Sequence, residues 1–153
     1  MTRQTFKLEG AKELAAQLKA LGEVPATKAG TKAARKATTV LKKAAQNKAP
    51  YAAHSTTKTW TNKDGTKRSA DYGHLKNNIK VRKRRSKALH TVSHVVTTGN
   101  AFWAYFLEFG TVHMKAQPFF KPAIDGAAQE AIDTLMVELR KAILAAAKKG
   151  GRA

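Results

Sequence analysis

Hydrophobic and polar positions alternate over residues 6–10 and then change to a helical period. The alternation predicts a short strand. After it, Leu14, Leu18 and Leu21 recur three or four positions apart, and Gly22 follows them where helices commonly end. The pattern of the first 22 residues therefore predicts a strand followed by a short helix.

A second helical stripe runs through residues 27–48 and ends at Ala49-Pro50. Its apolar positions are Ala33, Ala37, Val40, Leu41 and Ala44. Basic side chains occupy much of the remaining surface, so we predict an amphipathic helix with a thin apolar face and a cationic outer face. Because alanine removes little area from water, this helix should depend on its neighbours for stability.

Residues 51–72 carry few hydrophobic side chains and a strong turn signal. Asp64-Gly65 stands between two strand-like arms, residues 57–61 and 66–69. An Asp-Gly pair between such arms is typical of a tight β-hairpin. We predict a hairpin or loop that projects from the protein, since it has few apolar residues with which to dock.

Two further segments, residues 75–82 and 89–98, alternate in the manner of strands. The chain between them is the basic run at 82–87. We therefore predict two antiparallel strands joined by an almost entirely cationic turn.

The last third begins with an aromatic segment, residues 101–110. Its aromatic side chains at positions 102, 105, 106 and 109 follow helical spacing, and Gly110 lies where a short helix would stop. Pro118 and Pro122 then bracket the start of a long final helix. That helix has acidic residues early and basic residues late, which complements its macrodipole. Its apolar stripe comprises Ile124, Ala128, Ala131, Leu135, Leu139, Ile143 and Ala146.

These elements predict the fold class α+β, in the order β-α-α-β-β-α-α, with a small antiparallel sheet packed by helices. At 153 residues the chain has the length of one domain. We expect a single domain over 1–153, with a projecting hairpin at about 51–72 and a frayed end at 148–153.

The charge is strongly basic, with 29 Lys+Arg against 10 Asp+Glu and a formal net charge of +19. Of these, 22 basic and five acidic side chains lie in residues 1–100. Such an excess favours an acidic partner, either nucleic acid or an acidic protein surface. The alternative for the basic run is a solvated turn that discourages edge pairing. The candidate contacts with DNA or an acidic partner are Arg82, Lys83, Arg84, Arg85 and Lys87.

The sequence offers little for catalysis. It has no cysteine, which excludes thiolate chemistry, and its few acidic residues form no assignable catalytic pair. His90 and His94 are four apart, but without the helical zinc signature. There is also no phosphate-binding loop, signal-peptide core or membrane-length apolar run. We expect no enzyme activity, no metal, no cofactor and no membrane contact.

The aromatic segment has two interpretations, a buried core or a contact between subunits, because clustered aromatic residues dominate interface hot spots. Glu108 lies within it and must reach solvent, a cation or backbone donors to avoid a burial penalty. Our hypothesis pairs Glu108 with a basic group of this chain or of a neighbouring copy.

Three segments occur in order: GHLKNNI at 73–79, YFLEFGT at 105–111 and AQPFFKPA at 116–123. Together with the Phe-x-Leu-x-Gly pattern at 6–10 and the Ala/Lys-rich segment before Pro50, they cover nearly the whole chain. In this combination the sequence resembles the gene-product-ten-like neck, or tail-completion, proteins of long-tailed bacteriophages and prophages. The hairpin at 51–72 is longer than is usual in that family.

The resemblance implies a virion structural protein at the head–tail junction, similar in fold to tail-terminator and tail-tube domains. It implies a homomeric ring, commonly sixfold, assembled in the host cytoplasm. The implied partners are the tail terminator or tail tube, the head-closure or connector proteins, and genomic DNA through non-specific contact. For core or inter-subunit packing the candidates are Tyr105, Phe106, Glu108, Phe109, Phe119 and Phe120. The alternative, from charge alone, is a small basic DNA-binding or packaging-associated protein.

Overall fold

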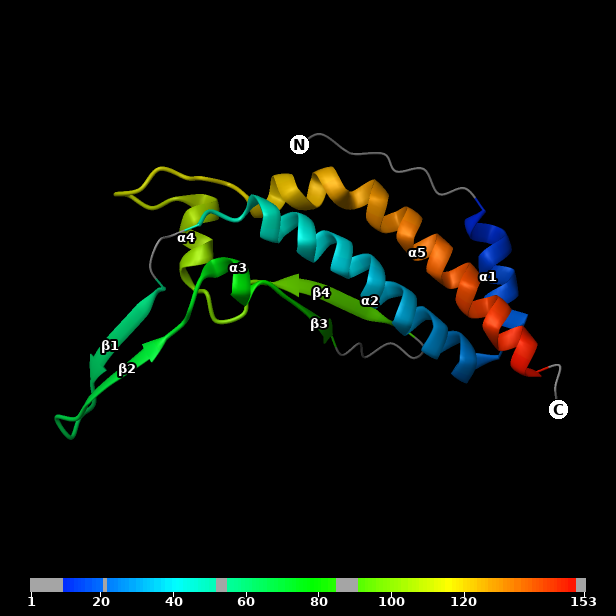
Figure 1. The fold of residues 1–153 in the computed structure, drawn as a ribbon, viewed down its shortest axis with the longest axis horizontal. Coiled ribbons are helices and arrows are strands. Elements are labelled where there is room, and N and C mark those ends of the chain that lie inside the picture. Colours follow the sequence, from blue (N-terminus) through cyan, green and yellow to red (C-terminus); the bar gives the residue numbers. More distant parts are fainter. Residues whose placement is uncertain (1–9, 21, 52–54, 85–90, 151–153) are drawn as a thin grey trace.

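The computed structural model describes residues 10–20, 22–51, 55–84 and 91–150 (Figure 1). Within them the elements follow in this order: α1 (Ala11–Ala20), α2 (Glu23–Lys48), β1 (Thr57–Thr61), β2 (Lys67–Asp71), α3 (Leu75–Asn78), β3 (Lys80–Arg84), β4 (Ser93–Thr97), α4 (Trp103–Phe109) and α5 (Phe120–Gly150). Helices and two small antiparallel sheets are both present, so the predicted α+β class is confirmed. The predicted strand at 6–10 lies almost wholly outside the described residues, as does the end of the chain at 151–153.

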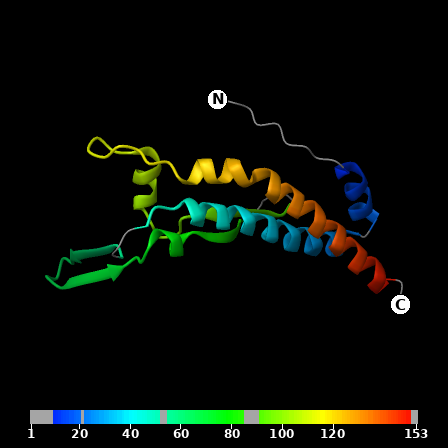
Figure 2. The ribbon, with the colours of Figure 1, turned by 45° about the horizontal axis from the view of Figure 1, so that its top comes forward.

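Helix α2 is the central element. It runs antiparallel to α5 along most of its length and packs on its other side against β3 and β4 (Figures 1 and 2). The predicted helix is confirmed at its C-terminal end but begins earlier than Thr27, at Glu23. Pro25 therefore lies in the first turn of α2 and does not precede it. A proline is tolerated there because the first N–H groups of a helix have no carbonyl partner.

The pair β3–β4 is antiparallel, as predicted, with Val81 opposite Val96 and Lys83 opposite His94. The prediction of a strand from Leu75 onward is wrong, because residues 75–78 form the single-turn helix α3. Leu75 and Ile79 are four positions apart and both buried. That spacing fits one face of a helical turn as well as it fits a strand, and the sequence pattern does not separate the two.

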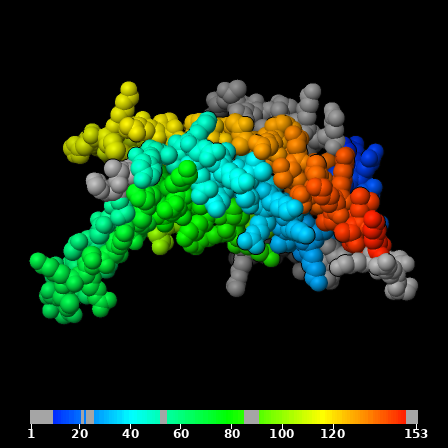
Figure 3. All heavy atoms as spheres, viewed as in Figure 1, coloured from blue at the N-terminus to red at the C-terminus, as the bar shows by residue number. Residues whose placement is uncertain are grey.

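Strands β1 and β2 form the predicted hairpin, which extends from the rest of the protein as an arm (Figures 1 and 3). At its tip Gly65 has a φ of 80°, and the backbone N–H of Thr66 donates to Asp64 Oδ1 at 3.0 Å. Every residue of β1 is exposed. At the base of the arm, Lys58 Nζ lies 5.7 Å from the ring centroid of Phe102.

The core lies where the end of α2, α3, α4 and the start of α5 meet. Its buried members are Ala45, Leu75, Ile79, Ala101, Ala104, Phe119 and Ala123. Nine of the fourteen buried hydrophobic residues in the described part of the chain are alanines, and Ile79 is the one large side chain there that is fully buried. Because alanine burial stabilises little, this core contributes less stability than one of larger side chains would.

Candidate assembly surface

Helix α4 carries an aromatic stripe on its solvent side. Four residues at helical spacing are exposed: Phe102 by 50%, Tyr105 by 64%, Phe106 by 42% and Phe109 by 67%. The opposite side of the helix contributes Ala104 to the core, with Trp103 and Leu107 packed against it. We call Phe102, Tyr105, Phe106 and Phe109 the aromatic stripe.

This arrangement corrects one of the two interpretations of the segment. Core packing applies to Phe119, which is buried, and to Phe120, which packs against the core. It does not apply to Tyr105, Phe106 and Phe109, which face solvent. The cause is that Ala104 occupies the inward side of α4 and that Ala101, just before the helix, is buried beside it. Phe102 joins the stripe although it was not among the candidate residues; the i, i+3, i+4, i+7 spacing is the signal that identifies it.

The stripe is held together by ring contacts. Tyr105 and Phe109 have their centroids 4.7 Å apart, and Phe106 contacts both Phe102 and Tyr105 edge to face, at 6.4 and 6.3 Å. Tyr72, at the base of the hairpin arm, contacts Phe102 at 5.9 Å. These contacts fix the orientation of the exposed rings.

A groove of about 380 Å³ runs beside the stripe, between α4, β4 and the start of α5. Tyr105 and Phe109 form one wall, and Phe119 and Phe120 lie on the α5 side. The groove adjoins the stripe, because Tyr105 and Phe109 belong to both. Helix α4 lies far from α1 in the ribbon (Figure 1).

Glu108 caps helix α5. Its Oε2 accepts hydrogen bonds from the backbone N–H groups of Phe119 (2.9 Å) and Phe120 (2.8 Å), and its Oε1 accepts one from Lys121 (2.9 Å). The next residue, Pro122, has no N–H. All the N–H groups that the first turn of α5 leaves without carbonyl partners are thus satisfied by one carboxylate.

Among the described residues, the hydrogen-bond donors of Glu108 are backbone groups and not a basic side chain, which corrects the hypothesis for this chain; pairing with a basic group of a neighbouring copy stays a prediction. Partial burial of the carboxyl opposes its ionisation. The three N–H donors outweigh that effect, with a smaller contribution from the charge of Lys121, and the pKa of Glu108 lies below its ordinary value of 4.5. The carboxylate is charged at neutral pH and ties the end of α4 to the start of α5.

Three of the five candidate basic contacts lie in a strand. Arg82, Lys83 and Arg84 lie in β3 and not in the connecting turn, whereas Arg85 and Lys87 lie outside the described residues. Since successive side chains of a strand point to opposite faces, Arg82 and Arg84 share one face and Lys83 lies on the other. The three are exposed but do not form one contiguous patch.

Lys83 lies opposite His94, on the neighbouring strand. Burial, together with the positive charges of Lys83 and Arg35, lowers the pKa of His94. Within the described ranges no group of three or more His, Asp or Glu side chains could hold a metal ion. No described helix combines the length and the apolar character that crossing a bilayer requires.

The fold and this surface define a small α+β protein with an exposed aromatic stripe on a short helix. A comparison with protein families identifies the class: residues 12–110 match the family described as "Bacteriophage HK97-gp10, putative tail-component". The chain belongs to this HK97-gp10-like family of phage tail components, as its motifs predict. The matched region runs from α1 to Gly110 and includes the aromatic stripe, while α5 lies beyond it. No curated protein and no solved structure gives a significant match.

Proposed function

We propose that this protein forms a homomeric ring at the head–tail junction of a virion and helps to join the tail to the DNA-filled head. The whole chain, residues 1–153, acts as one domain without a catalytic role, and the ring assembles in the host cytoplasm. The partners are neighbouring copies, the tail terminator or tail tube, and the head-closure or connector proteins. Membership in a phage tail family supports the structural role, and the resemblance to neck proteins supports sixfold symmetry.

The exposed aromatic stripe is the observation that carries this proposal. Three exposed aromatic rings on α4 and that of Phe102, the residue just before it, lie side by side. Large contiguous apolar patches on soluble proteins mark interaction sites. Aromatic residues in such patches account for much of the binding energy at protein interfaces. The alanine-rich core also supports an assembled state, since docking between copies would bury further apolar surface and so stabilise the protein.

A closed ring requires two different patches on each copy. The second patch in this proposal is an apolar cavity of about 580 Å³ between α1, α2 and α5, lined mainly by Leu18, Ala26, Ala34, Val92, Leu135 and Leu139. It involves α1, which lies at the end of the molecule away from α4 in both ribbon views (Figures 1 and 2). The stripe of one copy can therefore dock at this cavity of the next copy, head to tail.

Replacing two stripe residues should impair assembly without unfolding the protein. The double variant Tyr105→Ser with Phe109→Ser should join purified tails that lack the protein at least about tenfold less efficiently. Its matched control is Val137→Ser with Leu144→Ser, at two exposed positions of α5 (48% and 63%). The measurements are light scattering for mass and a head-joining assay with the reconstituted tails. Equal losses in both variants would exclude the stripe as the contact.

Because the chain has no cysteine, engineered pairs can test the head-to-tail geometry directly. Phe109→Cys combined with Ala26→Cys should, on oxidation in the assembled state, give a disulfide-linked ladder whose largest band reports the copy number. Phe109→Cys with Val137→Cys serves as the control and should give monomers. A ladder of equal strength from the control pair would contradict this arrangement.

A further inference from the structure

A cationic groove lies between α2 and β3, away from the aromatic stripe. It has a volume of about 420 Å³ and is lined by Arg35, Thr39, Lys42, Lys80 and Val81. Positions 35, 39 and 42 are spaced by four and three residues, so they share one face of α2. Three of the five lining residues are cations, and none is acidic.

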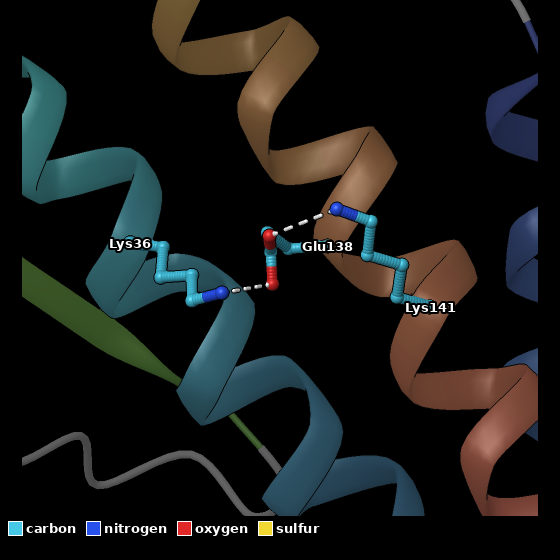
Figure 4. Close-up of polar contacts among 3 residues, drawn as sticks. All are labelled: Lys36, Glu138 and Lys141. Atoms are coloured by element: carbon cyan, nitrogen blue, oxygen red, sulfur yellow. Dashed lines mark hydrogen bonds and ion pairs between the residues drawn. The ribbon is translucent and has the colours of Figure 1, made fainter.

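The cations of α2 differ in whether a carboxylate neutralises them. Lys36 turns toward α5, where its Nζ lies 2.6 Å from Glu138 Oε2, and Lys141 contacts the other oxygen of that carboxylate at 3.7 Å (Figure 4). Arg35, its neighbour in sequence, turns toward the groove. In the part of the chain that the structure describes, no carboxylate lies within ion-pair distance of Arg35, Lys42 or Lys80. Among the described side chains, none therefore neutralises the charge of the groove.

The same face of α2 continues the charge beyond the groove. Lys28 and Lys32 precede Arg35 by seven and three positions, and both are exposed. From Lys28 to Lys42 the helix rises about 21 Å, at about 1.5 Å per residue. One strand of duplex DNA presents about six phosphates over that length. The positive field extends to the sheet as well, because Arg35 and Lys83 add to the effect of burial in lowering the pKa of His94.

We propose that the α2–β3 groove binds the phosphate backbone of double-stranded DNA without reading its sequence, through Arg35, Lys42 and Lys80. Thr39 donates its hydroxyl to the carbonyl of Arg35 at 2.8 Å, so the three cations supply the donors. Phosphate contacts of sequence-independent binders come chiefly from such Lys and Arg side chains. An acidic protein surface fits less well, because protein interfaces are centred on aromatic and other apolar anchors and the groove offers Val81 alone.

This inference deepens the proposed function by naming where the junction protein would touch the genome. It rests on the proposed function only in identifying the bound DNA as the phage genome. Binding of DNA by the purified chain and formation of a ring are separate measurements, so either can fail without the other.

The test measures binding of a short mixed-sequence DNA duplex by fluorescence anisotropy between about 50 and 200 mM NaCl. The triple variant Arg35→Gln, Lys42→Gln, Lys80→Gln should bind at least about tenfold more weakly at low salt. Its slope of log affinity against log salt should be shallower by about 2 to 3, because each phosphate contact contributes about 0.9. The control triple, Lys12→Gln, Lys19→Gln, Arg140→Gln, removes the same charge from α1 and α5 and should change the slope by less than about 1.

Circular dichroism melting confirms that each variant is folded. If the triple variant does not fold, the double variant Lys42→Gln with Lys80→Gln should still lower the slope by about 1 to 2, compared with Lys12→Gln with Lys19→Gln. Equal slopes for groove and control variants would overturn the proposal, as would no DNA binding by the unaltered protein at low salt. Equally effective competition by poly-glutamate of the same charge would assign the groove to an acidic polypeptide and also overturn it.

Discussion

The substitution Glu108→Ala is expected to lower the free energy of unfolding by about 2–3 kcal/mol. It removes the carboxylate that caps α5 and leaves the backbone N–H groups of Phe119, Phe120 and Lys121 without their acceptor. It also removes a negative charge from the positive end of a 31-residue helix. Chemical denaturation followed by circular dichroism measures the effect. The control Glu130→Ala, at an exposed position on the same helix, should change stability by less than about 0.5 kcal/mol.

The conservative variant Glu108→Gln separates hydrogen bonding from charge. If the glutamine oxygen takes the place of Oε2, it keeps the hydrogen bonds from Phe119 and Phe120. The NH2 group of the glutamine then faces the N–H of Lys121, and because both are donors that hydrogen bond is lost. We expect a loss of about 1–2 kcal/mol at neutral pH. Full stability in both variants would show that α5 does not depend on this cap.

The cap also predicts a dependence on pH. The pKa of Glu108 is lower in the folded protein than its ordinary value of 4.5. The stabilisation that the charged carboxylate gives to the fold is therefore complete above pH 4.5, and it is lost as the pH falls through the pKa of the folded protein. The stability difference between the unaltered protein and Glu108→Gln should therefore narrow below pH 4.5. A difference that stays constant to lower pH would contradict the charged cap.

The second large effect is expected for Gly110→Ala, with a loss of about 3 kcal/mol, or about 6–12 °C in melting temperature. Gly110 follows α4 with φ 77° and ψ 179°, a backbone conformation that essentially only glycine adopts. A Cβ there would lie 2.9 Å from the backbone N of Ala116 and 2.9 Å from the carbonyl oxygen of Met114. Neither atom can move without opening the loop between α4 and α5.

The matched control is Gly126→Ala in α5, where a Cβ would meet no atom within 4 Å. Alanine is the better helix former, so this variant should gain about 0.5–1 kcal/mol. Thermal melting of the two variants side by side gives opposite signs if the argument is right. A similar loss at both positions would show that the backbone conformation at Gly110 is not the cause.

Much of the fold could be predicted from residue spacing. The helical periods of α1, α2, α4 and α5 and the Asp64-Gly65 turn each identified an element that the structure contains. These signals are local, since a helix or a tight hairpin repeats its own pattern over a few residues. The single turn α3 could not be told from a strand, because four residues show no period.

The candidate assembly surface was harder to predict, because the exposure of a side chain depends on neighbours distant in sequence. Whether the rings of Tyr105 and Phe109 face the core or solvent is decided by the alanines on the other side of α4 and by Phe119, which fills the core from α5. The partner of Glu108 depends on where α5 begins relative to α4. Likewise, the groove cations Arg35 and Lys80 lie 45 positions apart, and only the packing of α2 on the sheet brings them together.

The alanine-lined contact between α2 and α5 sets an upper limit on side-chain size. Ala29, Ala33 and Ala37 on α2 and Ala127 and Ala131 on α5 are buried, and each already has the smallest side chain a helix commonly carries. Substitution there cannot leave a large cavity, but a larger side chain at these buried positions must overpack the contact, at about 1–3 kcal/mol per substitution. Substitutions at these alanines are thus limited by the lack of room for a larger side chain, whereas substitutions of Ile79 are limited by the need to fill the space that it occupies.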